Sequence, residues 1–160
     1  QMELLTTRRN IDKYEGLLFA PNSYSPDYLF ASVMVANPLF WMEMSNLDDD
    51  YADSLAKISN IYKEYKAELF ASHVIPVGNR PDGMNFSGYC CADEGKNTVH
   101  LILFREAAKV DTFTFDLPKD ISGLVGETIY QNNDANYSID SNKITVNFSA
   151  ERSFIWLRFA

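Results

Sequence analysis

Cysteine is scarce in this sequence, and its two cysteines are adjacent. Cys90 and Cys91 cannot join distant parts of the chain, so a disulfide framework is excluded. A hydrophobic core must therefore hold the fold together. Of the 160 residues, 46% are hydrophobic and 22% are charged. These proportions are ordinary for a globular domain and exclude wholesale disorder.

Positive charge is sparse as well. The chain has 14 Lys and Arg against 22 Asp and Glu, a net charge of −8, and both halves share the acidic excess. Without a basic patch or tail, we expect neither nucleic acid nor an anionic membrane surface as a partner. The most apolar stretch, residues 28–42, is interrupted by polar residues and falls short of the roughly 20 residues that span a bilayer.

The motifs of familiar active sites are missing. His73 and His100 are the only histidines and have no zinc-like spacing to the cysteines, so we expect neither a metal nor a cofactor. The cysteines fall in a predicted strand, where we interpret them as small buried side chains rather than nucleophiles. Two carboxylates at catalytic separation cannot be placed, and we interpret Glu43 as a structural carboxylate. No catalytic residue is predicted.

The first 47 residues are interpreted as an incomplete unit. Gly16–Ala20 is a short apolar run with the length of a buried strand. Ser25-Pro26 is typical of a helix start, and we expect a helix over residues 26–37 that resumes over 39–45, beyond a proline. A strand, a loop and a buried helix make up half of a βαβ unit, which indicates the end of a larger α/β domain.

Three polar or aromatic residues follow the predicted strand. If that strand belongs to a barrel, Asn22, Ser23 and Tyr24 lie at its carboxyl end, where barrel enzymes bind their substrates. They are therefore candidate substrate-binding residues of a complete barrel. The alternative is that they are ordinary turn residues before a capped helix.

Residues 48–72 are predicted to form an amphipathic linking helix. Its apolar residues recur at spacings of three and four, which gives one stripe along the helix. The stripe consists of Tyr51, Leu55, Ile58, Tyr62, Tyr65 and Leu69.

From residue 73 onward the hydrophobic period becomes two, which is typical of strands. Turn-forming residues separate the strands, and no helical segment intervenes. The predicted strands are His73–Val77, Phe86–Cys91, Thr98–Arg105, Thr112–Leu117, Gly126–Gln131, Asn136–Asp140, Lys143–Phe148 and Ser153–Phe159.

These patterns predict an α+β fold. N-terminal helices, the remnant of the end of a TIM barrel, are expected to pack on a C-terminal antiparallel β-sandwich of about eight strands over 73–160. Thr98–Arg105 and Ser153–Phe159 are apolar on both sides, so we expect them to be central in a sheet whose outer face is covered by the helices of residues 26–71.

Several motifs resemble the C-terminal part of α-galactosidase-type glycoside hydrolases, family 36 and its relatives. The longest is Ala36-Asn37-Pro38-Leu39-Phe40-Trp41-Met42-Glu43. The others are Arg8-Arg9-Asn10-Ile11-Asp12-Lys13-Tyr14, Asn22-Ser23-Tyr24-Ser25-Pro26-Asp27-Tyr28, Val74-Ile75-Pro76-Val77-Gly78, Pro81-Asp82-Gly83 and Leu101-Ile102-Leu103-Phe104-Arg105-Glu106.

The resemblance implies the last strand and helix of a catalytic barrel, a linking helix and a terminal sandwich. The catalytic aspartates of that family lie on earlier barrel strands, and nothing here matches those motifs. We therefore expect a non-catalytic segment that supports the missing barrel of a retaining glycosidase. Phe154 and Trp156 are expected to be buried within it.

Two other functions remain open from the residues. A stand-alone carbohydrate-binding module would need an exposed aromatic platform, which Tyr89, Tyr130 or Tyr137 would supply. A protein-interaction domain would use the apolar helix around Phe40-Trp41-Met42, with self-association through residues 28–44.

Overall fold

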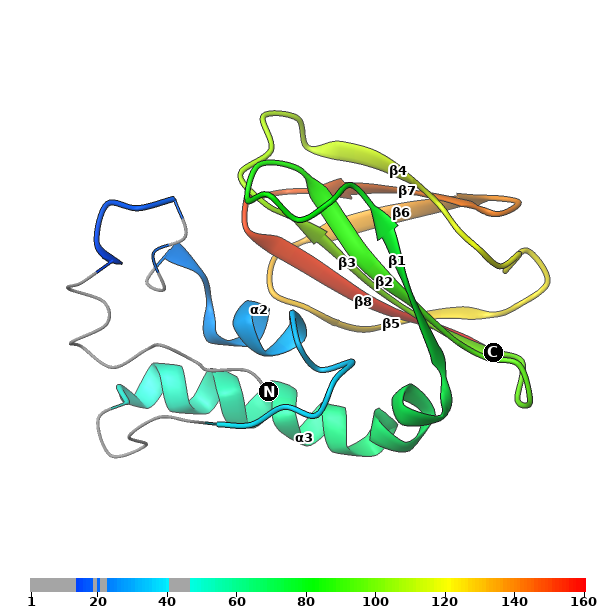
Figure 1. Ribbon diagram of the computed structural model, residues 1–160, viewed down its shortest axis with the longest axis horizontal. Helices are drawn as coiled ribbons and strands as arrows, with labels where there is room; N and C mark the ends of the chain where they lie inside the picture. The colour runs from blue at the N-terminus through cyan, green and yellow to red at the C-terminus, as the bar shows by residue number, and fades with distance from the viewer. Residues whose placement is uncertain (1–13, 19, 21–22, 41–46) are drawn as a thin grey trace. The chain divides into compact units, whose positions relative to one another are not determined.

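The computed structural model describes residues 14–18, 20, 23–40 and 47–160. This part of the chain has two helices, α2 (Pro26–Ala31) and α3 (Asp49–Ala71), and eight strands (Figure 1). The predicted α+β class is confirmed. The chain divides into two compact units, residues 1–64 and residues 65–160, with the boundary inside α3.

All eight predicted strands are present in the second unit, and their ends differ from the prediction by at most two residues. They are β1 (His73–Gly78), β2 (Phe86–Asp93), β3 (Thr98–Arg105), β4 (Thr112–Asp116), β5 (Gly126–Gln131), β6 (Ala135–Asp140), β7 (Lys143–Phe148) and β8 (Ser153–Phe159).

The strands form two antiparallel sheets that face each other (Figure 1). The larger sheet has the order β1-β2-β3-β8-β5, and the smaller has the order β4-β7-β6. β3 is the middle strand of the larger sheet and pairs with β8 from Val99 opposite Phe159 to Arg105 opposite Ser153. The prediction that these two strands are central is confirmed.

The core of the second unit lies between the two sheets. Alternate residues of β3 and β8 point into it and meet side chains from the smaller sheet, as the pleat requires. Its fully buried members include Cys90, Leu101, Leu103, Phe115, Ile144, Val146, Phe148, Ile155, Leu157 and Phe159.

A buried arginine joins the two sheets at one end of this core. Arg105 of β3 donates from Nη1 to the backbone oxygen of Phe148 on β7 at 3.0 Å, and from Nη2 to the backbone oxygen of Ala108 at 2.9 Å. Both acceptors are carbonyl groups that would otherwise need another donor. The guanidinium therefore fixes the end of β3 to the end of β7.

The strand predicted over Gly16–Ala20 is not found among the described residues, and this corrects the prediction. Residues 15–18 are turns, in which the N–H of Leu17 donates to the carbonyl of Tyr14 at 3.2 Å and that of Ala20 donates to Leu17 at 3.0 Å. Gly16 has a φ of +78°, which an extended strand does not allow. Local turn bonds satisfy the backbone here in place of a neighbouring strand.

The helix predicted over residues 26–37 is shorter than expected. α2 ends at Ala31, and residues 32–35 are turns. The hydroxyl of Ser32 donates to the carbonyl of Leu29 at 2.8 Å and so competes for an acceptor of the helical ladder. Residues 39–40 are not helical, and residues 41–46, which include Glu43, lie outside the described residues.

The apolar stripe predicted for the linking helix is confirmed. Leu55, Ile58 and Tyr62 are buried on the part of α3 that belongs to the first unit, and Leu69 is buried in the second. In the first unit, Phe30 of α2 meets Tyr62 edge to face with ring centroids 5.3 Å apart. This aromatic contact joins α2 to the middle of α3.

We predict that Gly88→Ala destabilises the sandwich. A Cβ at Gly88 would lie 2.7 Å from the backbone oxygen of Ile102 and 2.8 Å from Cδ2 of Leu103, so β2 and β3 would have to separate. The free energy of unfolding should fall by about 1–3 kcal/mol, as for other overpacked cores. Urea unfolding followed by circular dichroism measures this change.

Gly123→Ala is the matched control, because a Cβ there meets nothing within 4 Å. Its free energy of unfolding should stay within about 0.5 kcal/mol of the wild type. Equal stabilities of the two variants would contradict the close approach of β2 and β3.

Candidate functional site

A cluster of charged and aromatic side chains lies on the outer face of the larger sheet, the face turned away from the smaller sheet. His100 of β3 and Trp156 and Arg158 of β8 point to this face. Tyr65 and Glu68, from the part of α3 that belongs to the second unit, complete it. We call these five residues the α3–sheet network.

Glu68 is the centre of the network. Its carboxylate accepts from Arg158 at two points, from Nε at 2.8 Å and from Nη2 at 3.2 Å, which is the paired geometry that favours Arg over Lys. The same carboxylate lies 2.9 Å from Nε2 of His100. Arg158 also donates to Glu127 of β5 at 3.1 Å. One helical side chain thus holds side chains from two neighbouring strands.

Trp156 fixes the protonation pattern of His100. The indole Nε1–H is only a donor, and it lies 3.1 Å from Nδ1 of His100, which must therefore accept. The ring proton is then on Nε2 and is donated to Glu68. Both rings are fully buried, and the ring of Tyr65 meets them edge to face with centroids 5.8 Å and 5.5 Å away.

The charges of the network follow from this geometry. Burial lowers the pKa of His100 in spite of the neighbouring Glu68 carboxylate, so the imidazole is neutral. The hydrogen bonds from Arg158 hold the pKa of Glu68 below its usual value, and Glu68 in turn raises the pKa of Arg158. The network is therefore an ion pair with a neutral histidine.

This arrangement is suited to holding elements together rather than to proton transfer. Both nitrogens of His100 and the only polar atom of the Trp156 ring are already engaged within the network. A general base must reach a substrate proton with a free lone pair, and His100 has none.

The predicted substrate-binding residues lie in the first unit. Asn22 is outside the described residues. The N–H of Ser23 donates to the carbonyl of Ala20 at 2.9 Å, and the ring of Tyr24 packs against that of Tyr28 with centroids 5.1 Å apart. Both are half-buried. Their binding of a substrate stays a prediction.

The acidic residues of the turns have local roles. Asp82 accepts from the N–H of Met84 at 2.8 Å and from the side-chain amide of Asn85 at 2.6 Å, and the first of these bonds lowers its pKa. Asp93 accepts from the N–H of Gly95 at 3.0 Å. These bonds are Asx-turn contacts that shape the chain.

The three tyrosines proposed as a sugar platform do not share a face. Tyr89 and Tyr130 are on the outer face of the larger sheet, but Ile102 and Trp156 lie between them in the same row. Tyr130 is buried and stacks on Phe154. Tyr137 belongs to the smaller sheet and packs on the core. These positions do not form the flat, continuous aromatic surface that the module interpretation needs.

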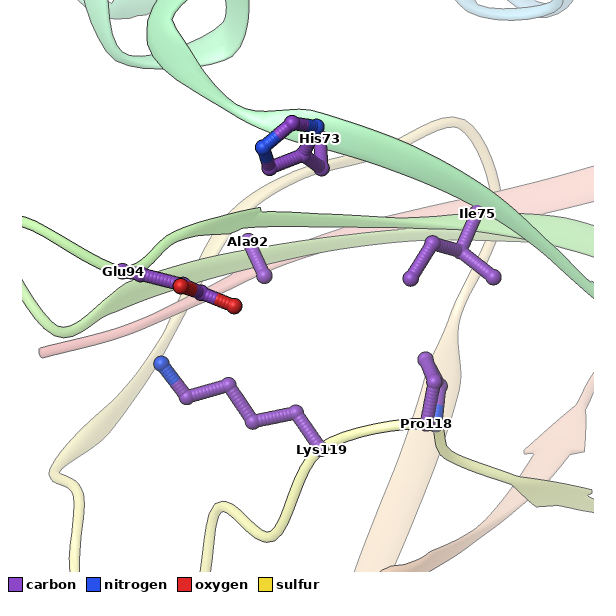
Figure 2. Close-up of a pocket in the computed structure, with 6 residues that line it drawn as sticks. All are labelled: His73, Ile75, Ala92, Glu94, Pro118 and Lys119. Atoms are coloured by element: carbon purple, nitrogen blue, oxygen red, sulfur yellow. The ribbon is translucent and has the colours of Figure 1, made fainter.

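A pocket of about 460 Å³ opens at the β1 edge of the sandwich. Its residues are His73, Ile75, Ala92, Glu94, Pro118 and Lys119. Figure 2 shows Glu94 and Lys119 at one end of the pocket and Ile75 and Pro118 at the other. The lining has a single carboxylate, whereas hydrolysis of a glycosidic bond generally uses two. It therefore lacks that pair.

Burial makes both cysteines poor nucleophiles. It raises the pKa of Cys90 to about 11 and that of Cys91 to about 12, so almost no thiolate forms near neutral pH. Cys90 points into the core, and Cys91 lies opposite His100 in the β2–β3 pairing. The prediction of small buried side chains is confirmed.

Among the described residues, no group of three or more His, Cys, Asp or Glu is arranged to hold a metal ion. None of the described helices has the length and apolarity to cross a membrane.

Comparisons of the chain with protein-family models, with curated proteins and with solved structures gave no match.

We predict that Glu68→Ala lowers the free energy of unfolding by about 2–3 kcal/mol, because it leaves the buried His100 Nε2–H without an acceptor and removes the paired acceptor of Arg158. Asp116→Ala is the control, since its ion pair with Lys143 is exposed and should contribute at most about 1 kcal/mol. Thermal or urea unfolding compares the two. A Glu68→Ala loss no larger than the control would argue against the network.

We also predict that iodoacetamide leaves both thiols of the folded chain unmodified at mildly alkaline pH, because burial suppresses the thiolate. Intact-mass spectrometry should show two added groups only after denaturation in guanidinium chloride. Rapid labelling of Cys90 in the folded chain would show that the core is open there.

Proposed function

We propose that this chain is a non-catalytic C-terminal segment of an α-galactosidase-like glycoside hydrolase, in which the β-sandwich supports the catalytic barrel. The resemblance of the motifs in residues 8–43 and 74–106 is the source of the family assignment. The order of the elements, a linking helix α3 followed by an eight-stranded antiparallel sandwich, agrees with what that resemblance implies.

The observation that carries the supporting role is the covered outer face of the larger sheet. An exposed sugar-binding face would present aromatic rings to solvent. Here Trp156 and Phe154 are fully buried. The indole N–H of Trp156 donates to His100, and the ring of Tyr65 packs edge to face against the indole. A face with these contacts is built for rigid packing against a helix.

The carboxylates and thiols of the described residues favour a structural role of the chain over a catalytic one. Among the described carboxylates, Glu68 forms an ion pair with Arg158, and Asp82 and Asp93 accept hydrogen bonds from backbone N–H groups of turns. The two thiols are protonated. Catalysis in the proposed parent enzyme is accordingly assigned to the preceding barrel strands.

The experiment compares the 160-residue chain with the complete product of its reading frame, using an aryl α-galactoside. We expect turnover by the complete protein and none above the buffer blank by the chain alone. Turnover by the isolated chain would overturn the non-catalytic assignment. Inactivity of the complete protein toward aryl glycosides of several sugars would overturn the family assignment.

A binding titration distinguishes a supporting segment from a stand-alone carbohydrate-binding module. The chain is titrated with galactose and with galacto-oligosaccharides by calorimetry, and the scaffold predicts no binding at millimolar concentrations. Millimolar or tighter binding that is lost in Tyr89→Ala, but retained in the control Tyr137→Ala, would favour the carbohydrate-binding module. Self-association through residues 28–44 stays a prediction, and light scattering at high concentration tests it.

A further inference from the structure

We propose that the C-terminal turns of α3, residues 65–71, are fastened to the larger sheet by a proton-sensitive latch, and that protonation of His100 opens it. The latch consists of the α3–sheet network defined above. It lies entirely within the second unit, and the proposed function does not require it.

The geometry admits only a neutral imidazole. Nδ1 of His100 accepts from the indole N–H of Trp156 at 3.1 Å, and Nε2 donates to Glu68 at 2.9 Å. A proton added at Nδ1 would set two N–H groups against each other at that separation. Because both rings have no exposed surface, neither can turn to water while the helix stays in place.

The groups around His100 come from four elements. Glu68 and the ring of Tyr65 face it from α3, Cys91 from β2, Trp156 and Arg158 from β8, and Glu127 acts on it from β5. Glu68 and Glu127 favour the charged imidazolium, whereas Arg158 disfavours it. Burial outweighs the carboxylates, so the pKa of His100 is lowered in the closed latch.

The direction of the pH effect follows from this lowering. A released His100 binds protons with its ordinary pKa, near 6.5, so the open state takes up more protons than the closed state below that pH. The latch is therefore stable above pH 6.5 and weakens as pH falls, by up to about tenfold in the opening equilibrium per pH unit. Protonation of Glu68 also weakens the latch, but only at more acidic pH, because the pKa of Glu68 is lowered from its ordinary value of 4.5.

The helix is the part that moves. β3 and β8 are joined by a seven-residue backbone ladder, from Val99–Phe159 to Arg105–Ser153. Residues 65–71 reach the sheet through the side chains of Glu68 and Tyr65, and Leu69 of the same turns is buried. Opening exposes the indole of Trp156 while the sandwich stays folded.

The first test follows the fluorescence of Trp156. The chain has two tryptophans, so Trp41→Phe makes Trp156 the only one. Between about pH 8 and pH 4.5 we expect its emission to shift to the red with a midpoint below 6.5. His100→Gln should abolish the shift, because the amide accepts from Trp156 and donates to Glu68 but does not titrate. His73→Gln, on β1, is the histidine control and should leave the curve unchanged.

The second test needs no substitution. Hydrogen–deuterium exchange of the 160-residue chain, corrected for intrinsic pH dependence, is compared at about pH 7.5 and pH 5.5. We expect faster exchange in residues 65–71 and unchanged protection in β3 and β8. An unchanged titration in His100→Gln, equal acceleration across the sandwich, or no acceleration of residues 65–71 would each overturn the latch.

Discussion

The contact that organises the outer face of the larger sheet is the carboxylate of Glu68 between Arg158 and His100. It is the point where a helical side chain reaches the two central strands of the larger sheet. The core between the sheets is apolar and would form without it. The outer face of β3 and β8 is different, because it carries the half-buried Arg158 and the buried His100 and Trp156, whose polar groups need hydrogen-bond partners there. The carboxylate satisfies the first two, and His100 the third.

This constraint explains why the same face is unsuited to binding sugar. Trp156 at its centre is buried and donates its indole N–H to His100. Tyr89 and Tyr130 are separated from each other in the row by Ile102 and Trp156. The pocket at the β1 edge has one carboxylate in its lining. The outer face of the larger sheet binds the helix α3 through Glu68 and Tyr65. This packing is the reason why we propose a supporting role beside a catalytic barrel.

The sequence predicted the sandwich well because turn-forming residues separate the strands and the hydrophobic period becomes two from residue 73 onward. The two-sided apolar pattern of Thr98–Arg105 and Ser153–Phe159 also predicted their central place. The first unit was predicted less well, since Gly16–Ala20 has the composition of a strand but takes local turns. The sequence analysis did not predict the α3–sheet network, because Glu68 is 32 residues from His100 and 90 residues from Arg158. Its only local signal is a polar residue at an outward position of each of two apolar strands, His100 and Arg158.

The measurement that tests this account most directly is a double-mutant cycle on Glu68 and Arg158. Glu68→Ala, Arg158→Ala and the double variant are unfolded in urea, and the coupling energy is obtained from the four free energies. A half-buried, two-point ion pair predicts a favourable coupling of about 1–3 kcal/mol. A coupling of zero within error would mean that the two side chains contribute independently, and it would contradict the central place given to Glu68.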